Sequence, residues 1–256
     1  MSHIAKPDSL VIPSRFCGPP GIGNGGYVCG RIAGYADGPV TVTLRRPAPL
    51  ATPMTVERDG GRSVRVRHGR TLIAEAATAP ASPALEIPSP VSPAEAHAAA
   101  GCARYYADPL FPDCFVCGIG RESGDGLRIF PGPLAGRPVW AAPWTPDPSV
   151  ADAGGRVRPE VVWAALDCPS GIAAAEVASL APDTAILLGQ MTASLASRPA
   201  AGDQCLVIAW PGGRDGRKLL AGSALLGPGG TVLAAARAVW LTVLRPDPAL
   251  AAEGAS

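Results

Sequence analysis

Residues 158–173 read RPEVVWAALDCPSGIA and belong to the longest helix candidate of the chain, residues 159–178. Proline suits the first position of a helix, because the N–H group that it lacks would have no partner there. Glu160 follows in the first turn, where the positive end of the helix dipole favours a carboxylate, so we interpret it as structural. We expect neighbouring strands to wrap around this helix and bury it.

Asp167 lies within this helix, between the apolar residues AAL and the pair CP. A carboxylate in such surroundings loses hydration, which raises its pKa and suits it to act as a base. Trp163 precedes Asp167 by one helical turn, so both side chains are expected to face one pocket. A purely structural role is the alternative: Asp167 could N-cap a helical segment that restarts after a kink at Pro169.

Apolar runs alternate with turn residues after the helix, which predicts an antiparallel meander. The expected strands are residues 186–195, 205–210, 217–226 and 231–244, with turns at 198–203, 212–213 and 229–230. Two further strands, 127–130 (LRIF) and 139–144 (VWAAPW), are expected before the helix. Runs of strands with one helix per unit predict the α+β class rather than a parallel sheet.

The first half of the chain follows the same plan. We expect a strand at 10–16, a glycine loop at 18–26, a helix at 27–35, and strands at 40–44, 54–58, 63–68 and 71–78. Arg46-Pro47 precedes Gly60-Gly61 by the same offset as Arg198-Pro199 precedes Gly212-Gly213. This internal repeat predicts two tandem copies of one unit, each an antiparallel sheet wrapped around a central helix.

The boundaries between the units follow from a proline-rich stretch, residues 80–93. We assign residues 1–88 to the first unit, 89–126 to a linker helix and a Cys-x-x-Cys loop, 127–246 to the second unit and 247–256 to a flexible tail. Ser92-Pro93-Ala94-Glu95 is a capping-box pattern, which predicts that the linker helix spans residues 93–100.

The composition excludes some classes of function. Hydrophobic residues make up 47% of the 256 residues, charged residues 17%, and the formal net charge is +1. A nucleic-acid surface would need a basic excess, so no nucleic-acid partner is expected. No apolar run approaches the length of about 20 residues that a membrane span needs, and the N-terminus does not resemble a signal peptide. We therefore expect a cytoplasmic protein without a membrane partner, with its seven cysteines as thiols.

Two stretches resemble hotdog-fold acyl-CoA thioesterases. CFVCGIGRESGDGLRIFPGP (residues 114–133) is similar to the segment that opens a hotdog unit, and residues 158–173 are similar to its central helix. That helix usually opens with His-Gly-Gly and carries an acid nine residues after the His. Arg158 stands in the His position here and Asp167 in the acidic position. Asn24-Gly25-Gly26-Tyr27 resembles the same opening, but Ala33 occupies the acidic position of the first unit.

The resemblance implies a double hotdog, similar to medium-chain acyl-CoA thioesterases made of two fused units. It implies hydrolysis of an acyl-CoA or other acyl thioester in a cleft between the units, with Asp167 as the base or nucleophile. The helix opening at Asn24, Gly25 and Gly26 would face this acid and bind the thioester carbonyl through backbone N–H groups. Alternatively, Asn24 is only a helix cap followed by flexible glycines.

The family's acid has a Thr or Ser and a Gln as partners, whereas Pro211 and Ala238 stand near those positions here. Neither can polarise a water, which favours a non-hydrolytic acyl-CoA-binding protein or a dehydratase-like relative as the alternative. A dehydratase would need a histidine beside its acid, and His3, His68 and His97 all lie far from the second helix in sequence.

Gln190 and Thr192 lie on the strand after the long helix and are further substrate-binding candidates. From a strand beside the core, Gln190 could hold a water next to Asp167. The alternative is that both side chains face solvent, as polar residues on strands commonly do.

The cysteines suggest one rival site. His97, Cys102, Cys114 and Cys117 could together form a tetrahedral zinc site. However, the segment that opens a hotdog unit has the same Cys-x-x-Cys spacing without any metal, so we expect neither a metal nor another cofactor. Since hotdog units work as pairs, the fused pair is expected to be a monomer or to form a homodimer.

Overall fold

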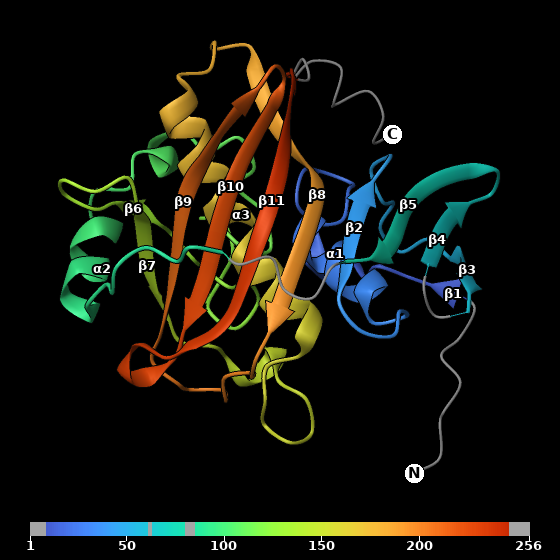
Figure 1. Cartoon of the computed structure of the whole chain (residues 1–256), viewed down its shortest axis with the longest axis horizontal. Coiled ribbons are helices and arrows are strands. Elements are labelled where there is room, and N and C mark those ends of the chain that lie inside the picture. Colours follow the sequence, from blue (N-terminus) through green and yellow to red (C-terminus); the bar gives the residue numbers. More distant parts are fainter. Residues whose placement is uncertain (1–8, 61–62, 80–84, 246–256) are drawn as a thin grey trace.

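The computed structural model describes residues 9–60, 63–79 and 85–245, which form one antiparallel sheet and three α-helices (Figure 1). The helices are α1 (Gly25–Ala33), α2 (Pro93–Ala100) and α3 (Pro159–Ala178). The first half contributes β1 (Ser9–Leu10), β2 (Val40–Leu44), β3 (Met54–Asp59), β4 (Ser63–His68) and β5 (Thr71–Thr78). The second half contributes β6 (Gly132–Pro133), β7 (Trp140–Trp144), β8 (Thr184–Leu195), β9 (Cys205–Asp215), β10 (Lys218–Leu226) and β11 (Val232–Leu244).

The order of the strands in the sheet reveals the repeat. The first half runs β1-β3-β4-β5-β2, and the second half runs β8-β11-β10-β9-β7, which is the same permutation in reverse. In the chain, α1 follows β1 and α3 follows β7, so each half has one helix at the equivalent place. The predicted α+β fold of two tandem units is confirmed.

The two half-sheets join where β2 pairs with β8, with Thr41 opposite Thr192 and Thr43 opposite Gln190. This antiparallel pairing continues the hydrogen-bonded ladder from one half into the other, so neither β2 nor β8 is left as an exposed edge.

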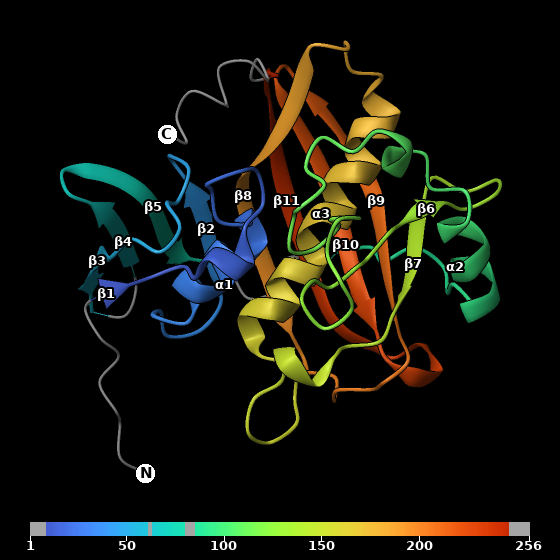
Figure 2. The same cartoon turned by 180° about the vertical axis from the view of Figure 1, so that it is seen from behind.

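α1 and α3, the central helices of the two units, lie on one face of the sheet (Figure 2). There α3 packs across β8 to β11 and contacts α1. α2 covers the other face at the β7 edge, as the alternation along the strands requires. Val207 belongs to the large core cluster beside α3, whereas its neighbour Ile208 belongs to the small cluster beside α2. Most residues of α3 are buried, as the sequence predicted.

α3 continues through Pro169 as one helix. Pro169 has no N–H for the Ala165 carbonyl one turn earlier, and each of the next two carbonyls accepts a hydrogen bond from a side-chain hydroxyl. The Leu166 carbonyl accepts a hydrogen bond from Ser223 Oγ at 2.7 Å, and the Asp167 carbonyl accepts one from Ser170 Oγ at 2.7 Å. By length and composition α3 could cross a membrane, but 72% of its apolar window is buried in the molecule. It is thus the core helix of its unit.

Two of the predicted strands are wrong. Residues 127–130 are not a strand: Arg128 has a left-handed backbone with φ of 54°, and Ile129 N donates to the Val116 carbonyl at 3.0 Å. This segment therefore pairs with the Cys-x-x-Cys turn instead of with a strand. Of residues 10–16, only Leu10 belongs to a strand, and a 3₁₀ helix occupies Ser14–Phe16.

The turn predicted at Gly212-Gly213 is also wrong. Both glycines lie inside β9, and the chain reverses between Asp215 and Lys218. Pairing with β10 shifts there, from Leu220 opposite Gly213 to Ala221 opposite Pro211, which leaves Gly212 as the extra residue of a bulge. Gly213 has φ of 110°, a conformation that suits glycine. In the first half Gly60 does lie between strands, and Gly61 falls outside the described residues.

Several local predictions are confirmed. The linker helix spans Pro93–Ala100, and its capping box is complete: Glu95 N donates to Ser92 Oγ, and Ser92 N donates to Glu95 Oε2. The first helix begins at Gly25, two residues earlier than predicted, because Asn24 is its N-cap. The predicted tail, 247–256, lies outside the described residues, and the unit boundaries remain a prediction.

Candidate functional site

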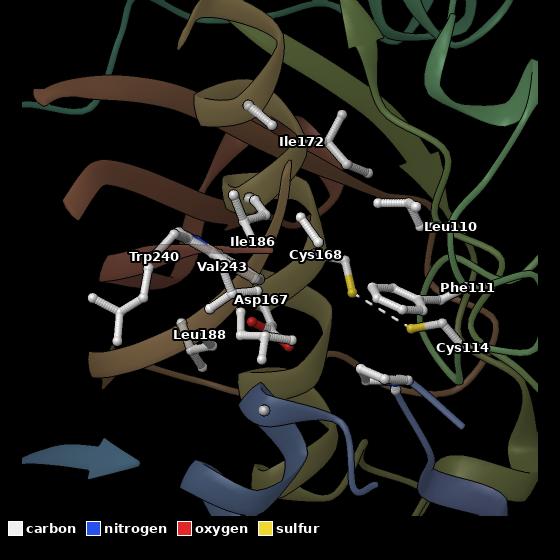
Figure 3. A pocket seen from close by; sticks show the side chains of 18 of the residues that line it. Leu110, Phe111, Cys114, Asp167, Cys168, Ile172, Ile186, Leu188, Trp240 and Val243 are labelled. Atoms are coloured by element: carbon white, nitrogen blue, oxygen red, sulfur yellow. Dashed lines mark hydrogen bonds between the residues drawn. The ribbon is translucent and has the colours of Figure 1, made fainter. Parts of the chain in front are cut away.

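A cavity of about 590 Å³ is lined by residues of both halves of the chain. Its walls are mostly apolar side chains from α3, β8, β11 and the segment before the Cys-x-x-Cys turn (Figure 3): Leu110, Phe111, Ile172, Ile186, Leu188, Trp240 and Val243. Polar groups gather in one part of it, where the start of α1 meets the middle of α3: Asn24, Cys114, Cys117, Asp167 and Cys168. Its size and lining are typical of a small-molecule site.

Asp167 is the central group of this cavity and is only 1% exposed. Its Oδ2 accepts hydrogen bonds from Gly26 N and from Asn24 Nδ2, both at 2.9 Å. Its Oδ1 is buried and has no hydrogen-bond partner. Burial raises the pKa of Asp167 to about 7, against the opposing effect of the Gly26 hydrogen bond. One carboxylate oxygen is thus fixed by two donors, and the other is buried without a hydrogen bond in the described chain.

The N-terminus of α1 supplies the groups that hold Asp167. Asn24 is 2% exposed, and its Oδ1 accepts from Tyr27 N at 2.9 Å while its carbonyl accepts from Val28 N. With Gly26 N bonded to Asp167, only the first N–H of the helix, that of Gly25, has no hydrogen bond within the described chain. Gly25 also lines the cavity. The predicted meeting of the Asn24 helix opening with the acid of the other unit is found.

The glycines of α1 have a further reason to be glycine. A Cβ added to Gly26 would lie 2.4 Å from Asp167 Cβ and 2.7 Å from the Trp163 carbonyl. A Cβ on Gly30, one turn later, would lie 2.6 Å from Glu160 Cα. Backbone and Cβ atoms cannot give way as side-chain tips can. The two glycines therefore allow α1 and α3 to cross in close contact, which brings Asn24 within reach of Asp167.

Asp167 does act at the N-terminus of a helix, but the helix is α1 and not its own helix α3. α3 does not restart at Pro169, and Asp167 does not cap its own helix. Instead its carboxylate accepts from the first turn of α1, a helix of the other unit. A carboxylate at a helix N-terminus is stabilised by the helix dipole, so this contact also holds the two units together.

Three of the predicted substrate-binding residues lie elsewhere. Trp163 is 5% exposed and packs against Gly30 of α1, outside the cavity lining. Gln190 Nε2 donates to Thr43 Oγ1 at 2.9 Å, and Thr192 Oγ1 lies 2.7 Å from Thr41 Oγ1. These two side chains alternate with the fully buried Met191, which places them on the sheet face away from the helices. They bridge β8 to β2 and do not reach Asp167.

The rival zinc set, His97, Cys102, Cys114 and Cys117, is not brought together. His97 is exposed on α2, where its Nδ1 contacts the Pro93 carbonyl at 2.9 Å, and Cys102 is exposed just after that helix. Because α2 packs on the opposite face of the sheet, neither reaches the Cys-x-x-Cys turn. Instead, the sulfurs of Cys114, Cys117 and Cys168 lie within 4.8 Å of one another. Cys168 was missed as a site residue, although it directly follows Asp167.

The three thiols affect one another. The Cys114 and Cys168 sulfurs are 3.6 Å apart and point toward each other at the wall of the cavity (Figure 3). Hydrogen bonds from the thiols of Cys117 and Cys168 hold the pKa of Cys114 well below its usual range. The same hydrogen bonds to Cys114, together with burial, raise the pKa of Cys117 and of Cys168.

The family's usual partners of the acid have no substitute at this site. Ala238 lies buried in β11 opposite Met191, and Pro211 lies in β9 beside the bulge. Neither lines the cavity, and among the described lining residues none is a serine, glutamine or histidine. One threonine, Thr184 at the start of β8, does line it, but its Oγ1 donates to Asp183 Oδ1 at 3.4 Å and not to Asp167. The polar partners of Asp167 are those of the α1 opening instead.

No family model matches the sequence, and no curated protein matches it. Among solved structures, the TesB protein of Mycobacterium avium subspecies paratuberculosis is similar over 92% of both chains, with 13% identity and a TM-score of 0.55. A thioesterase from Haemophilus influenzae covers 48% of this chain and 82% of its own, with 11% identity and a TM-score of 0.42. A Streptococcus mutans protein bound to acetyl-CoA covers 43% of this chain and 86% of its own, with 9% identity and a TM-score of 0.38.

The full-length likeness to the TesB protein shows the class of fold. The chain is a double-hotdog protein: two hotdog units in tandem, with their half-sheets joined at β2 and β8.

Proposed function

We propose that the protein hydrolyses acyl thioesters of the acyl-CoA class in the cavity around Asp167. The observation that carries the proposal is the carboxylate itself. Asp167 is buried in a largely apolar cavity, one of its oxygens is held by two donors, and the other has no partner. A general base works best when its pKa lies near the working pH, and the pKa of Asp167 is raised to about 7, close to neutral pH.

In the hydrolysis, Oδ1 of Asp167 accepts a proton from a water molecule, and the water oxygen bonds to the thioester carbon. The carbon–sulfur bond then breaks, and the leaving thiolate takes up the proton. The carbonyl oxygen becomes negative in the tetrahedral intermediate and needs hydrogen-bond donors. The free N–H group of Gly25, at the start of α1, is one such donor. Direct attack by the Asp167 carboxylate, with an anhydride intermediate, uses the same geometry.

The rest of the cavity suits the two ends of such a substrate. Its apolar walls, which include Ile172, Ile186 and Val243, match a hydrocarbon acyl group. Arg45, Arg46 and Arg104 are exposed and also line the cavity, so they stand at its solvent edge. Arginines bind phosphate groups well, and coenzyme A carries its phosphates at the end remote from the thioester.

A non-hydrolytic acyl-CoA-binding protein is the second candidate. Gly26 N and the Asn24 amide both donate to Asp167, so they are not free to bind a carbonyl. A dehydratase is less well supported, because no histidine of the described chain lines the cavity.

The test is thiol release from a panel of acyl-CoAs by the wild type and by Asp167→Asn. We expect turnover by the wild type and a loss of about 10²–10⁴-fold in kcat for Asp167→Asn, the usual contribution of a general base. Asp215→Asn is the matched control, since that carboxylate is 81% exposed beside the β9–β10 turn. Binding without turnover across the panel would support the binding protein, and equal turnover by wild type and Asp167→Asn would remove Asp167 from the mechanism.

A further inference from the structure

Cys114, Cys117 and Cys168 form a sulfur cluster that the proposed hydrolysis does not use. Two of the cysteines come from the turn before the second unit and the third comes from the middle of α3, so the cluster joins segments far apart in the chain. Cys114 and Cys117 are buried and Cys168 is partly buried. Single buried cysteines are common, but three sulfurs that converge from separate segments are the usual arrangement of a metal site.

The spacing of the sulfurs fits a metal ion. Zinc binds thiolate sulfur at about 2.3 Å, which separates neighbouring sulfurs by about 3.7–4.0 Å. The Cys114 and Cys168 sulfurs are 3.6 Å apart, and all three lie within 4.8 Å of one another. A disulfide would need about 2.05 Å between two of them and would leave the third sulfur unused.

The surroundings are built to stabilise thiolates. The Asn24 amide donates to the sulfurs of Cys168 at 3.6 Å and Cys114 at 4.0 Å. Donors of this kind orient metal ligands and offset their negative charge.

The turn itself is rigid. Gly118 N donates to the Cys114 carbonyl at 2.8 Å, which closes the Cys-x-x-Cys turn. A Cβ on Gly118 would lie 2.5 Å from both the Cys114 and the Pro112 carbonyl oxygens, so only glycine fits. Phe115 N donates to the Cys17 carbonyl, and the Phe115 ring packs edge-on against Phe16. The two sulfurs of the turn are thereby held in place without a metal.

The described part of the chain supplies three ligands at this place. Among the described residues, no carboxylate or imidazole completes the group within the distance that the three sulfurs share. All three cysteines line the cavity, as does Asp167, whose buried Oδ1 has no partner. A site with three protein ligands and one open position is the pattern of zinc sites that bind a water or a substrate.

We infer that Cys114, Cys117 and Cys168 bind one Zn²⁺ as thiolates and leave its fourth coordination position open to the cavity. The fourth ligand is then a water or the sulfur of a bound thiol. This site departs from the expectation that no metal is bound, and it shares only Cys114 and Cys117 with the rival zinc set that the sequence suggested. It does not depend on the proposed hydrolysis, because metal binding is measured without substrate.

The test is metal analysis of the purified chain, before and after removal of metal and reconstitution with Zn²⁺, followed by Co²⁺ substitution. We expect about one metal ion per chain after reconstitution, and a thiolate-to-cobalt charge-transfer band in the near ultraviolet. Cys168→Ser is expected to weaken zinc binding at least tenfold and to reduce the cobalt band. Cys102→Ser, which changes an exposed cysteine outside the cluster, is expected to bind like the wild type.

Circular dichroism shows whether each variant is folded, and Cys117→Ser provides a second variant if Cys168→Ser does not fold. Clearly substoichiometric metal in the folded, reduced wild type would overturn the site. Unchanged zinc affinity in both cluster variants, or loss of zinc from Cys102→Ser, would overturn it as well. Asp167→Asn separates the two proposals, because it is expected to lower kcat by about 10²–10⁴-fold while it retains the metal.

Discussion

Asn24 illustrates how one side chain connects both proposals. Its oxygen caps α1, and its amide group donates to Asp167 and lies beside the sulfurs of Cys114 and Cys168. The sequence predicted a helix cap at this position and its approach to the acid of the other unit. It gave no indication of the sulfur contacts, because Asn24 and Cys168 are 144 residues apart.

The two roles of Asn24 can be separated by substitution. Asn24→Ser keeps an oxygen that can cap α1 but loses the donor to Asp167, whereas Asn24→Ala loses both. We expect Asn24→Ala to be less stable than Asn24→Ser by about 1 kcal/mol, the usual value of a helix N-cap. Urea unfolding of both variants measures the difference, and equal stabilities would contradict the importance of the cap.

The spatial partners of Cys168 could not be predicted from its position in the sequence. Cys168 lies next to Asp167 in the long helix, yet its partners Cys114 and Cys117 belong to a turn outside either helix. The sequence grouped those two with His97 and Cys102 because they are close in the chain. Proximity along the chain is a poor guide here, since α2 packs on the opposite face of the sheet.

At the scale of elements, the crossing of α1 and α3 determines the geometry of the site. Gly26 and Gly30 are spaced by one helical turn and leave the helix backbones in contact. The sequence suggested that Gly26 makes room for a substrate carbonyl. In the structure it makes room for the neighbouring helix, while Gly25 is the glycine that lines the cavity.

Gly26→Ala tests this crossing. The added methyl group would lie 2.4 Å from Asp167 Cβ, so the helices must move apart, and we expect a loss of about 1–3 kcal/mol in the free energy of unfolding. Gly101→Ala is the control, because the nearest atom to its Cβ is 3.4 Å away. Denaturant unfolding of both variants gives the comparison, and a Gly26→Ala variant as stable as the control would contradict the close packing.

For the whole molecule, the β2–β8 junction makes one sheet out of two units. Thr41, Thr43, Gln190 and Thr192 hydrogen-bond in pairs across it, on the face away from the helices. Gln190 and Thr192 therefore belong to the architecture of the pair rather than to the cavity. The same junction brings the start of α1 to the middle of α3, so the site exists only when both units are assembled.

Gln190→Ala tests the assignment to the junction. Removal of one partly buried hydrogen bond is expected to cost about 0.5–1.5 kcal/mol of stability. Acyl-CoA turnover and acyl-CoA affinity are expected to stay within about twofold of the wild type, since the side chain points away from Asp167. Thermal unfolding and the thiol-release assay measure the two effects, and a large loss of turnover in a stable variant would return Gln190 to the site.

The sequence by itself determined the elements and their repetition. Capping residues, alternation of apolar residues and turn glycines placed the three helices and most strands, because these signals act over a few neighbouring residues. Through the resemblance of the two helix openings, it also predicted that the opening at Asn24 to Gly26 faces Asp167. Only the tertiary structure decided that residues 127–130 bend at Arg128, that Gln190 faces away from the helices, and that Cys168 joins Cys114 and Cys117. The physical reason is that these features depend on contacts between segments far apart in the chain, to which local periodicity does not respond.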